Sequence, residues 1–345
     1  MSFELGQTVG NYEFIDILER SKAGVTYKVR NVPLQRFEAL KVLPSGWQED
    51  QERAERFLRE MKVHARLQHP NIVAFYSASQ LGDQMVMTTE LVEGLTLEQI
   101  LEGGPLPVAD AVRHMAQALA ALECAHEEGV VHREITPGHM IITPDGTLKL
   151  TGFGLAKASN APQLTQVGAV MGSLQYISPE QVKGAPNIDG RADLYSLGVV
   201  FYQAVTGKLP FESASQFDLM LAHVNQAPQP PVERQPELPA AINEIILKAL
   251  AKEPLDRYQT AKEFREGLEA GAPVPVVKPV AAVVPAPPVE APPKANLPPM
   301  AQPVPGASGR PSIASMTTPQ MLVAGVFLFL MMLIAFYAVL ISGRR

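Results

Sequence analysis

The feature that most constrains the fold of this chain is a change of residue pattern close to Gly94. Before it, short runs rich in β-branched and aromatic residues at 12–18, 24–31 and 37–43 predict strands separated by turns. After it, apolar residues recur at helical spacing, most clearly over 108–128. A strand-rich segment followed by a helical one predicts an α+β fold with two lobes.

Other segments follow the same division. Two further strands are expected at 72–79 and 84–89, and a charged amphipathic helix is expected over 48–68. Helices are also expected at 192–206 and 240–251. The first of these two is apolar nearly all round, so we expect it to lie at the centre of the helical lobe.

The composition changes twice beyond residue 270. Residues 271–319 are rich in Pro, Ala and Val, which predicts a linker that favours polyproline II. A ligand for a proline-reading module is the alternative reading of this segment. Residues 320–341 hold an uninterrupted apolar run that is long enough, as a helix, to cross about 30 Å of hydrocarbon. We therefore expect one transmembrane helix in contact with the lipid bilayer.

The two ends of the chain predict its topology. Residues 1–12 lack the charged start and apolar stretch of a secretory signal. We therefore expect the N-terminal domain to remain cytoplasmic and the last helix to enter the cell (inner) membrane as a single-pass tail anchor. Arg344 and Arg345 would then lie on the far side, against the positive-inside tendency.

Charge and cysteine content exclude some classes of function. The formal net charge is -6 and no basic stripe is evident, so nucleic acid is not expected as a partner. Cys124 is the single cysteine, which excludes an internal disulfide, and its alanine-rich helical context favours a packing role.

A series of short motifs stands in one order along residues 12–270. They are Lys41 in EALK, Glu60 in FLRE, HPNIV from His69, TELVEG from Thr89, HRE from His132, GFG from Gly152, SPE from Ser178, DLYSLG from Asp193, and Arg257. Together they resemble a protein kinase domain, with a small lobe at 12–90 and a large lobe at 91–270. With the linker and the apolar run, the layout resembles the membrane-anchored, eukaryotic-like serine/threonine kinases of bacteria.

The resemblance implies a nucleotide cleft. Its residues would be Lys41, Glu60, Gly24, Thr89, Glu90 and Val92. Lys41 and Glu60 match the paired lysine and glutamate of the family, and Gly24 matches the last glycine of its phosphate loop. Glu19 and Ser21 stand where the first two glycines are expected. A carboxylate at Glu19 impedes the approach of phosphate to the backbone and repels its charge. The alternative is that Arg20 and Lys22 partly offset this repulsion by turning their side chains inward.

The positions that would hold metal have changed. Gly152 replaces the metal-binding carboxylate of the family, and His139 replaces its asparagine, although Mg²⁺ prefers oxygen ligands. We therefore expect no metal site. Glu134 stands at the position of the catalytic base but is longer by one methylene, and Thr136 replaces a lysine. Asp145 is not expected to substitute as a ligand, because PDG is typical of a tight turn.

Several structural positions of the family remain. Residues that match its internal spine are His132, Phe153 and Asp193, with His64 as a fourth member. Glu180 and Arg257 match a buried ion pair that ties the activation segment to the large lobe.

These departures predict a membrane-tethered serine/threonine pseudokinase that acts as a cytoplasmic signalling scaffold or regulator without phosphoryl transfer. Its expected partners are cytoplasmic proteins, another kinase among them. The alternative is a divergent, active ATP-dependent protein serine/threonine kinase of low activity that uses Lys41 and Glu134. No cofactor is assigned, and ATP bound weakly or without Mg²⁺ is a third reading.

Overall fold

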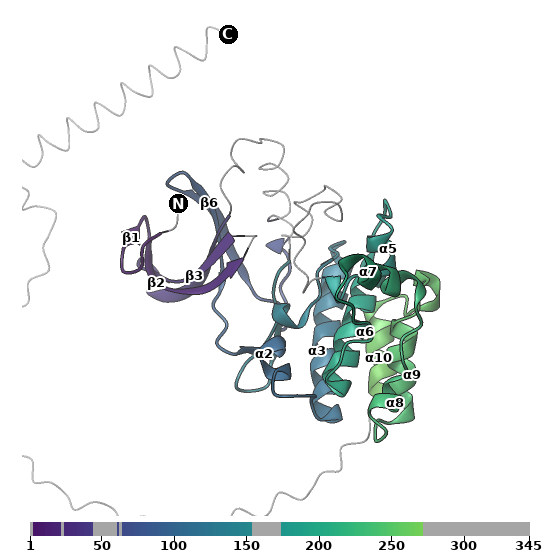
Figure 1. Ribbon diagram of the computed structural model, residues 1–345. Helices are drawn as coiled ribbons and strands as arrows, with labels where there is room; N and C mark the ends of the chain where they lie inside the picture. The colour runs from purple at the N-terminus through teal and green to yellow at the C-terminus, as the bar shows by residue number, and fades with distance from the viewer. Residues whose placement is uncertain (1–2, 22–23, 44–60, 62–63, 154–173, 272–345) are drawn as a thin grey trace, which may run out of the picture. The chain divides into compact units, whose positions relative to one another are not determined.

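The computed structural model describes residues 3–21, 24–43, 61, 64–153 and 174–271, which form a strand-rich lobe followed by a helical lobe (Figure 1). The predicted α+β arrangement is therefore confirmed. The predicted transmembrane helix and all but the first residue of the predicted linker lie outside the described residues. Within the described part of the chain, every helix is too short or too polar to cross a membrane.

The small lobe contains a six-stranded antiparallel sheet with the order β1-β2-β3-β4-β6-β5. Its strands are β1 (Thr8–Val9), β2 (Tyr12–Ser21), β3 (Gly24–Asn31), β4 (Arg36–Val42), β5 (Phe75–Leu81) and β6 (Gln84–Glu90). Most of the helix predicted at 48–68 lies outside the described residues.

The strand predicted at 72–79 begins only at Phe75. Ile72 instead forms an isolated parallel bridge with Leu150, and the N–H of Val73 donates to the Leu150 carbonyl at 3.0 Å. The start of the predicted strand therefore pairs with the large lobe rather than with the small-lobe sheet. Alternation of side chains along the sequence does not reveal such a distant partner.

One face of the small-lobe sheet forms an apolar core. Phe14, Tyr27 and Leu40 are fully buried there because alternate residues of β2, β3 and β4 point to the same side. Phe3 extends this core by stacking on Phe14, with ring centroids 4.5 Å apart. The opposite face carries Lys41, so the core fixes the side of the sheet on which the lysine stands.

The large lobe is mainly helical. Its helices are α2 (Leu97–Leu101), α3 (Val108–Glu127), η1 (Pro137–His139), α5 (Pro179–Val182), α6 (Gly190–Thr206), α7 (Gln216–Asn225), α8 (Pro231–Arg234), α9 (Ala240–Ala249), η3 (Pro254–Asp256) and α10 (Ala261–Gly271). Its short strands β7 (Leu95–Thr96), β8 (Met140–Ile142) and β9 (Leu148–Leu150) form a three-stranded sheet.

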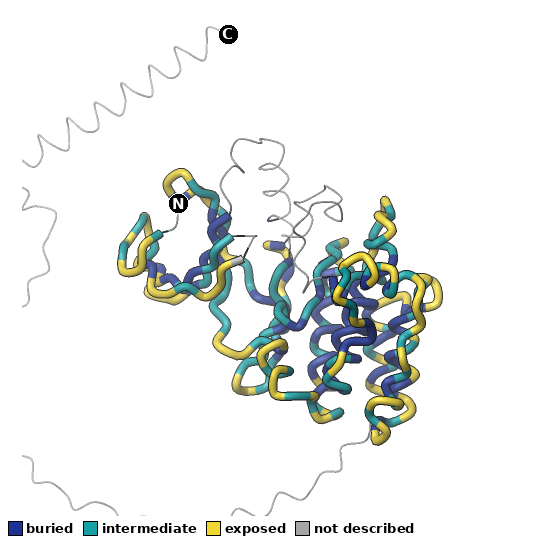
Figure 2. Tube along the Cα trace, viewed as in Figure 1, coloured by how far each residue is buried: buried dark blue, intermediate teal, exposed yellow. Residues whose placement is uncertain are grey.

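Helix α6 lies in the core of the large lobe, as its all-round apolar character predicts. Most of its residues are buried, as are those on one face of α3 (Figure 2). The carboxylate of Asp189 caps the first turn of α6 by accepting from the N–H of Arg191 at 3.0 Å. Gly207 ends the helix in the left-handed region, at a φ of 71°. The caps place Asp193 in the first turn, where it meets the loop that follows α3.

Candidate functional site

The buried carboxylate of Asp193 positions the loop that begins at His132. It accepts from the backbone N–H groups of His132 at 2.8 Å and Arg133 at 2.7 Å, and it lies 2.8 Å from the Nε2 of His126. Arg133 has a φ of 67°, a strained value for a residue with a side chain. The two charge-assisted bonds offset that strain and hold the loop in the conformation that the structure shows. The sequence did not single out His126.

Four rings lie in a row between the two lobes. Phe153 contacts His132 edge-on with centroids 4.6 Å apart, and it lies 5.7 Å from His64, which in turn lies 5.5 Å from Phe75. The Nε2 of His132 lies 2.7 Å from the carbonyl oxygen of Thr151. The structure thus brings together the spine residues that the resemblance implied.

Burial determines the protonation state of the two histidines in this row. It lowers the pKa of His64 to about 4 and the pKa of His132 to about 4. The carboxylate of Asp193 acts in the opposite direction on His132 but is the smaller influence. Both rings are therefore neutral at pH 7.

Glu180 and Arg257 form a bidentate ion pair inside the large lobe. The two Nη atoms of Arg257 donate to Oε1 and Oε2 of Glu180 at 2.8 and 2.9 Å. The guanidinium is fully buried and also donates to the carbonyl oxygens of Ala251, Arg191 and Lys252. The contact has the geometry that the resemblance implied, and it anchors α5 to the segment after η3.

Lys41 stands on the face of the small-lobe sheet opposite the core. Burial lowers the pKa of its ammonium group, and the carboxylates of Glu19 and Glu134 partly oppose that shift. Thr26 lies between Lys41 and Glu19 in the pairing register of β2, β3 and β4. Glu60, the partner that the resemblance implies for Lys41, lies outside the described residues.

Gly24 is required by the packing of β3 against β4. Its φ is 125°, and a Cβ atom at this position would lie 2.0 Å from the carbonyl oxygen of Val42. No other residue fits there without a backbone shift. This steric reason for a glycine exists whether or not a phosphate approaches the loop.

Glu90 at the end of β6 joins the two lobes. Its carboxylate lies 2.8 Å from the Nζ of Lys149 in β9 and accepts from the N–H of Ala74 at 3.2 Å. Thr89 pairs with Ala39 across β4 and β6. Sequence reasoning placed Glu90 in a nucleotide cleft and missed its ion pair, since Lys149 carries no local signal.

Val92 is partly buried in the segment between β6 and β7. It lies directly beyond the strand that carries Thr89 and Glu90, the two residues that the resemblance places with it in the nucleotide cleft.

The two changed metal positions, His139 and Gly152, lie against each other. A Cβ atom on Gly152 would stand 3.1 Å from the Cδ2 and 3.2 Å from the Nε2 of His139. The imidazole is held there because its Nδ1–H donates to the Glu134 carbonyl oxygen at 2.8 Å, with the hydroxyl of Thr136 at 3.3 Å. The ring thus occupies the space next to Gly152 into which a longer side chain would extend.

This arrangement does not fit Mg²⁺. The ion prefers six oxygen ligands, but Gly152 has no side chain and His139 presents an imidazole nitrogen. The described residues contain no group of three or more His, Cys, Asp or Glu side chains that could hold a metal ion. Asp145 lies in the turn between β8 and β9, where its carboxylate contacts the hydroxyl groups of Thr143 and Thr147.

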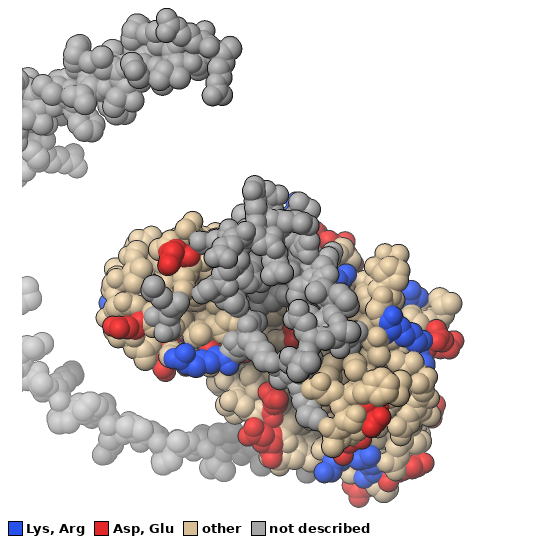
Figure 3. Space-filling model, turned by 45° about the horizontal axis from the view of Figure 1, so that its top comes forward, with Lys and Arg blue, Asp and Glu red and all other residues tan. Residues whose placement is uncertain are grey.

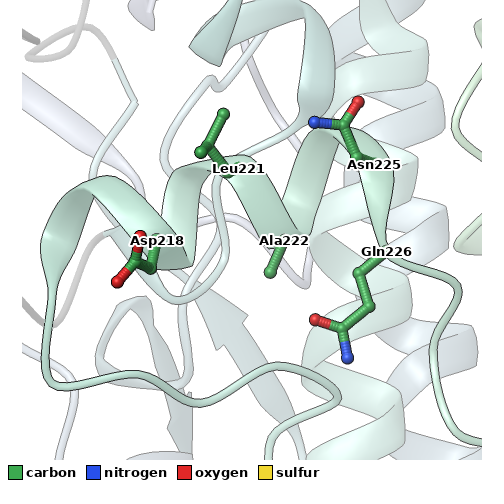
Figure 4. Close-up of a pocket in the computed structure, with 5 residues that line it drawn as sticks. All are labelled: Asp218, Leu221, Ala222, Asn225 and Gln226. Atoms are coloured by element: carbon green, nitrogen blue, oxygen red, sulfur yellow. The ribbon is translucent and has the colours of Figure 1, made fainter.

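The surface adds little to this site. On the face shown in Figure 3, acidic and basic side chains are interspersed over the described residues. A shallow hollow lies on α7, lined by Asp218, Leu221, Ala222, Asn225 and Gln226 (Figure 4). It contains none of the motif residues, so it is not part of the candidate site.

A family model described as "Protein kinase domain" matches residues 12–266. The chain is 38% identical over 267 residues to a probable serine/threonine-protein kinase of Clostridium perfringens, covering 77% of this chain and 39% of that protein. It is 35% identical over 262 residues to the serine/threonine-protein kinase PrkC of Bacillus subtilis, covering 75% and 40%. The chain thus spans about 40% of the length of these relatives.

Among solved structures, the kinase domain of PknI from Mycobacterium tuberculosis is similar to this chain. The TM-score is 0.63 and the sequence identity is 28%, with 79% of this chain and 100% of that domain covered. The similarity includes both lobes, because the whole of the PknI domain is matched.

Proposed function

Since this chain belongs to the protein kinase family, we propose that it is a signalling protein with a kinase fold that does not carry out Mg²⁺-dependent phosphoryl transfer. In this proposal it is a serine/threonine pseudokinase that presents the surface of its two lobes to cytoplasmic proteins, another kinase among them. Fold alone does not establish chemistry, so the argument rests on the site.

The packing of His139 against Gly152 carries the proposal. Phosphoryl transfer depends on metal ions that bridge the phosphates and neutralise the charge of the transition state. The loss of such a charge costs several kcal/mol, and every 1.36 kcal/mol is a factor of ten in rate. Without metal ligands at 139 and 152, Lys41 and Glu134 lack the cation that they act with in the family.

A second candidate is an active serine/threonine kinase of low activity. The relatives named above are serine/threonine kinases, and this supports the second candidate more directly than the first. Lys41 is still a lysine and Glu134 still a carboxylate. Against it stands the site itself, because a base displaced by about 1 Å can lose about 100-fold in rate before the missing metal is considered.

Transfer of labelled phosphate from ATP tests both candidates. The 345-residue chain, purified in detergent, is incubated with Mg²⁺ or Mn²⁺ and a basic protein substrate, and Lys41→Ala serves as the control. We expect wild type and Lys41→Ala to give the same background. Transfer by the wild type that Lys41→Ala abolishes would refute the pseudokinase and establish the second candidate.

A gain-of-function variant tests whether the contact between His139 and Gly152 is the reason for the missing metal site. His139→Asn combined with Gly152→Asp supplies two oxygen ligands and removes the ring from the space between them. The double variant should show tighter binding of ATP in the presence of Mg²⁺ than in EDTA. If it binds Mg²⁺ and ATP no better than wild type, the His139 and Gly152 contact is not the reason for the missing metal.

We also propose that residues 320–341 anchor the chain in the cell membrane and that 271–319 separate the anchor from the cytoplasmic domain. The support is the length of the apolar run and the proline-rich composition before it. Protease added outside intact cells should leave the kinase-like domain undigested. Its digestion under those conditions would contradict the topology.

A further inference from the structure

We infer that two copies of this chain associate through α7, with the two α7 helices antiparallel and related by a two-fold axis. The inference goes beyond the proposed function, because it uses none of the cleft residues and applies to an active kinase as well as to a pseudokinase. Three features of α7 carry it: an exposed apolar face, a symmetrical arrangement of the residues that line its hollow, and opposite charges at its two ends.

One face of α7 presents apolar side chains to solvent. Phe217 is 64% exposed and Leu221 is 41% exposed, and they stand about one turn apart, so they lie on the same side of the helix. The opposite side carries the buried residues Leu219 and His223, which fix the helix on the large lobe. An exposed apolar face beside a hollow is typical of an interaction surface.

The residues that line the hollow are placed symmetrically along the helix. Asp218 and Asn225 lie towards its two ends, and Leu221 and Ala222 lie between them (Figure 4). A two-fold axis that passes between 221 and 222 makes position 218 of one copy face 225 of the other, and 221 face 222. The apolar residues then meet at the centre, and each Asp218 carboxylate faces an Asn225 amide at the edge. This is the apolar centre and polar rim of a protein interface.

The two ends of α7 carry opposite charges, which favours a second copy in the antiparallel direction. The first turn has the exposed carboxylate of Asp218. Near the other end, the Nζ of Lys252 donates to the carbonyl oxygens of Ala222 and His223 at 3.3 and 2.8 Å. Burial lowers the pKa of this ammonium group to about 8, so it is mostly charged at pH 7. Antiparallel helices bring each Asp218 towards the Lys252 of the other copy, whereas parallel helices bring the two Asp218 carboxylates together.

The small size of α7 limits the strength of this contact. Its 10 residues extend over about 15 Å, so the interface is smaller than the roughly 1,200 to 2,000 Å² of stable complexes. We therefore expect weak self-association, with a Kd on the order of 10 to 100 µM. A strongly basic or strongly acidic partner fits this surface less well, because each would meet a like charge at one end of α7.

Sedimentation of the 345-residue chain in detergent, at about 1 to 300 µM, tests the inference. We expect reversible dimers, and Leu221→Glu should raise the Kd at least about tenfold because it places a charge at the centre of the contact in both copies. The matched control is Leu34→Glu, the same change at a leucine of the small lobe that is 59% exposed, and it should leave the Kd unchanged. Both variants should unfold at the temperature of the wild type within a few degrees, because both leucines are exposed.

An exchange of charges tests the direction of the helices. Asp218→Lys should raise the Kd about tenfold, because the introduced ammonium group approaches Lys252 of the other copy and the dimer contains this contact twice. Addition of Asn225→Asp should return the Kd to within about threefold of the wild-type value, because the introduced ammonium then faces the introduced carboxylate. In a parallel pair, position 218 faces 218, and the second substitution would restore nothing.

Each other outcome overturns the inference. A wild type that stays monomeric up to about 300 µM would show that the face is not used, and a Kd that Leu221→Glu leaves unchanged would place the contact outside α7. Loss of association in Leu34→Glu would assign the contact to the small lobe. A double variant that remains as weak as Asp218→Lys would exclude the antiparallel direction.

Discussion

The ion pair of Glu180 and Arg257 allows a quantitative test of how the large lobe is held together. We expect Glu180→Gln to destabilise the protein far more than an equivalent change on the surface. The substitution keeps the shape of the side chain but removes the charge opposite a fully buried guanidinium. Arg257 keeps its bonds to three backbone carbonyl oxygens, so its position is retained while its charge is left without a counterion.

The magnitude follows from this burial. Removal of one partner from a buried ion pair costs about 3 to 5 kcal/mol. Because Gln still offers one acceptor to Arg257, we expect the lower end, about 3 kcal/mol. For a domain of this size each kcal/mol shifts the melting temperature by about 2 to 4 °C, so the expected loss is about 6 to 12 °C.

The assay is thermal and urea unfolding of the 345-residue chain, followed by circular dichroism. Glu253→Gln is the matched control, since Glu253 pairs with Lys183 at 3.5 Å and both side chains are about half exposed or more. Exposed pairs contribute under about 1 kcal/mol, so the control should lose less than about 4 °C. Equal losses in the two variants would refute the argument that burial of Arg257 determines the cost.

Three further predictions concern single side chains. Since burial lowers the pKa of His64 to about 4 from 6.5, the unfolded chain binds a proton that the folded chain does not, and stability is lost as pH falls from about 6.5 towards 4. His64→Leu should therefore remove about 2 kcal/mol of the loss between pH 7.5 and pH 5 in urea unfolding, and an unchanged pH profile would contradict this. Asp145→Asn should leave the affinity for ATP unchanged by calorimetry in both Mg²⁺ and EDTA, because its carboxylate serves the turn, and an affinity in Mg²⁺ that is lower for the variant than for the wild type would show instead that it is a ligand. Lys149→Met leaves the partly buried Glu90 without its ion pair and should lower the free energy of unfolding by about 1 to 3 kcal/mol. The control Lys183→Met, in an exposed pair, should lower it by under about 1 kcal/mol, and equal losses in urea unfolding would contradict the argument from burial.

The division of the fold into two lobes was predictable because strands and helices have different periods. The patterns at 24–31 and 192–206 are local properties of the sequence, and the structure has β3 and α6 there. The failure at Ile72 has a different cause. Its pairing with Leu150 joins residues far apart in the chain, and no local period contains that information.

The candidate site shows the same limit of prediction from sequence: contacts between distant residues are not visible in it. Alignment of motifs placed Gly152 and His139 separately as missing metal ligands, but it did not reveal that one side chain fills the space beside the other. The facing of Glu19 and Lys41 depends on the registers of two strand pairs, and the ion pair between Glu90 and Lys149 depends on how the lobes meet. Sequence supplies the residue types, whereas these couplings arise only in the folded chain.

The contact between His139 and Gly152 makes the effects of substitutions at the two positions interdependent, which determines how a metal site can be introduced there. An aspartate at 152 would take a φ of 89°, which costs about 1 to 2 kcal/mol for a residue with a side chain, and its Cβ would also press on the imidazole at 3.1 Å. An asparagine at 139 removes the imidazole and is compatible with glycine at 152. Introducing a metal site should therefore begin with the substitution at 139, because a change at 152 alone combines a strained φ with a close contact to the imidazole.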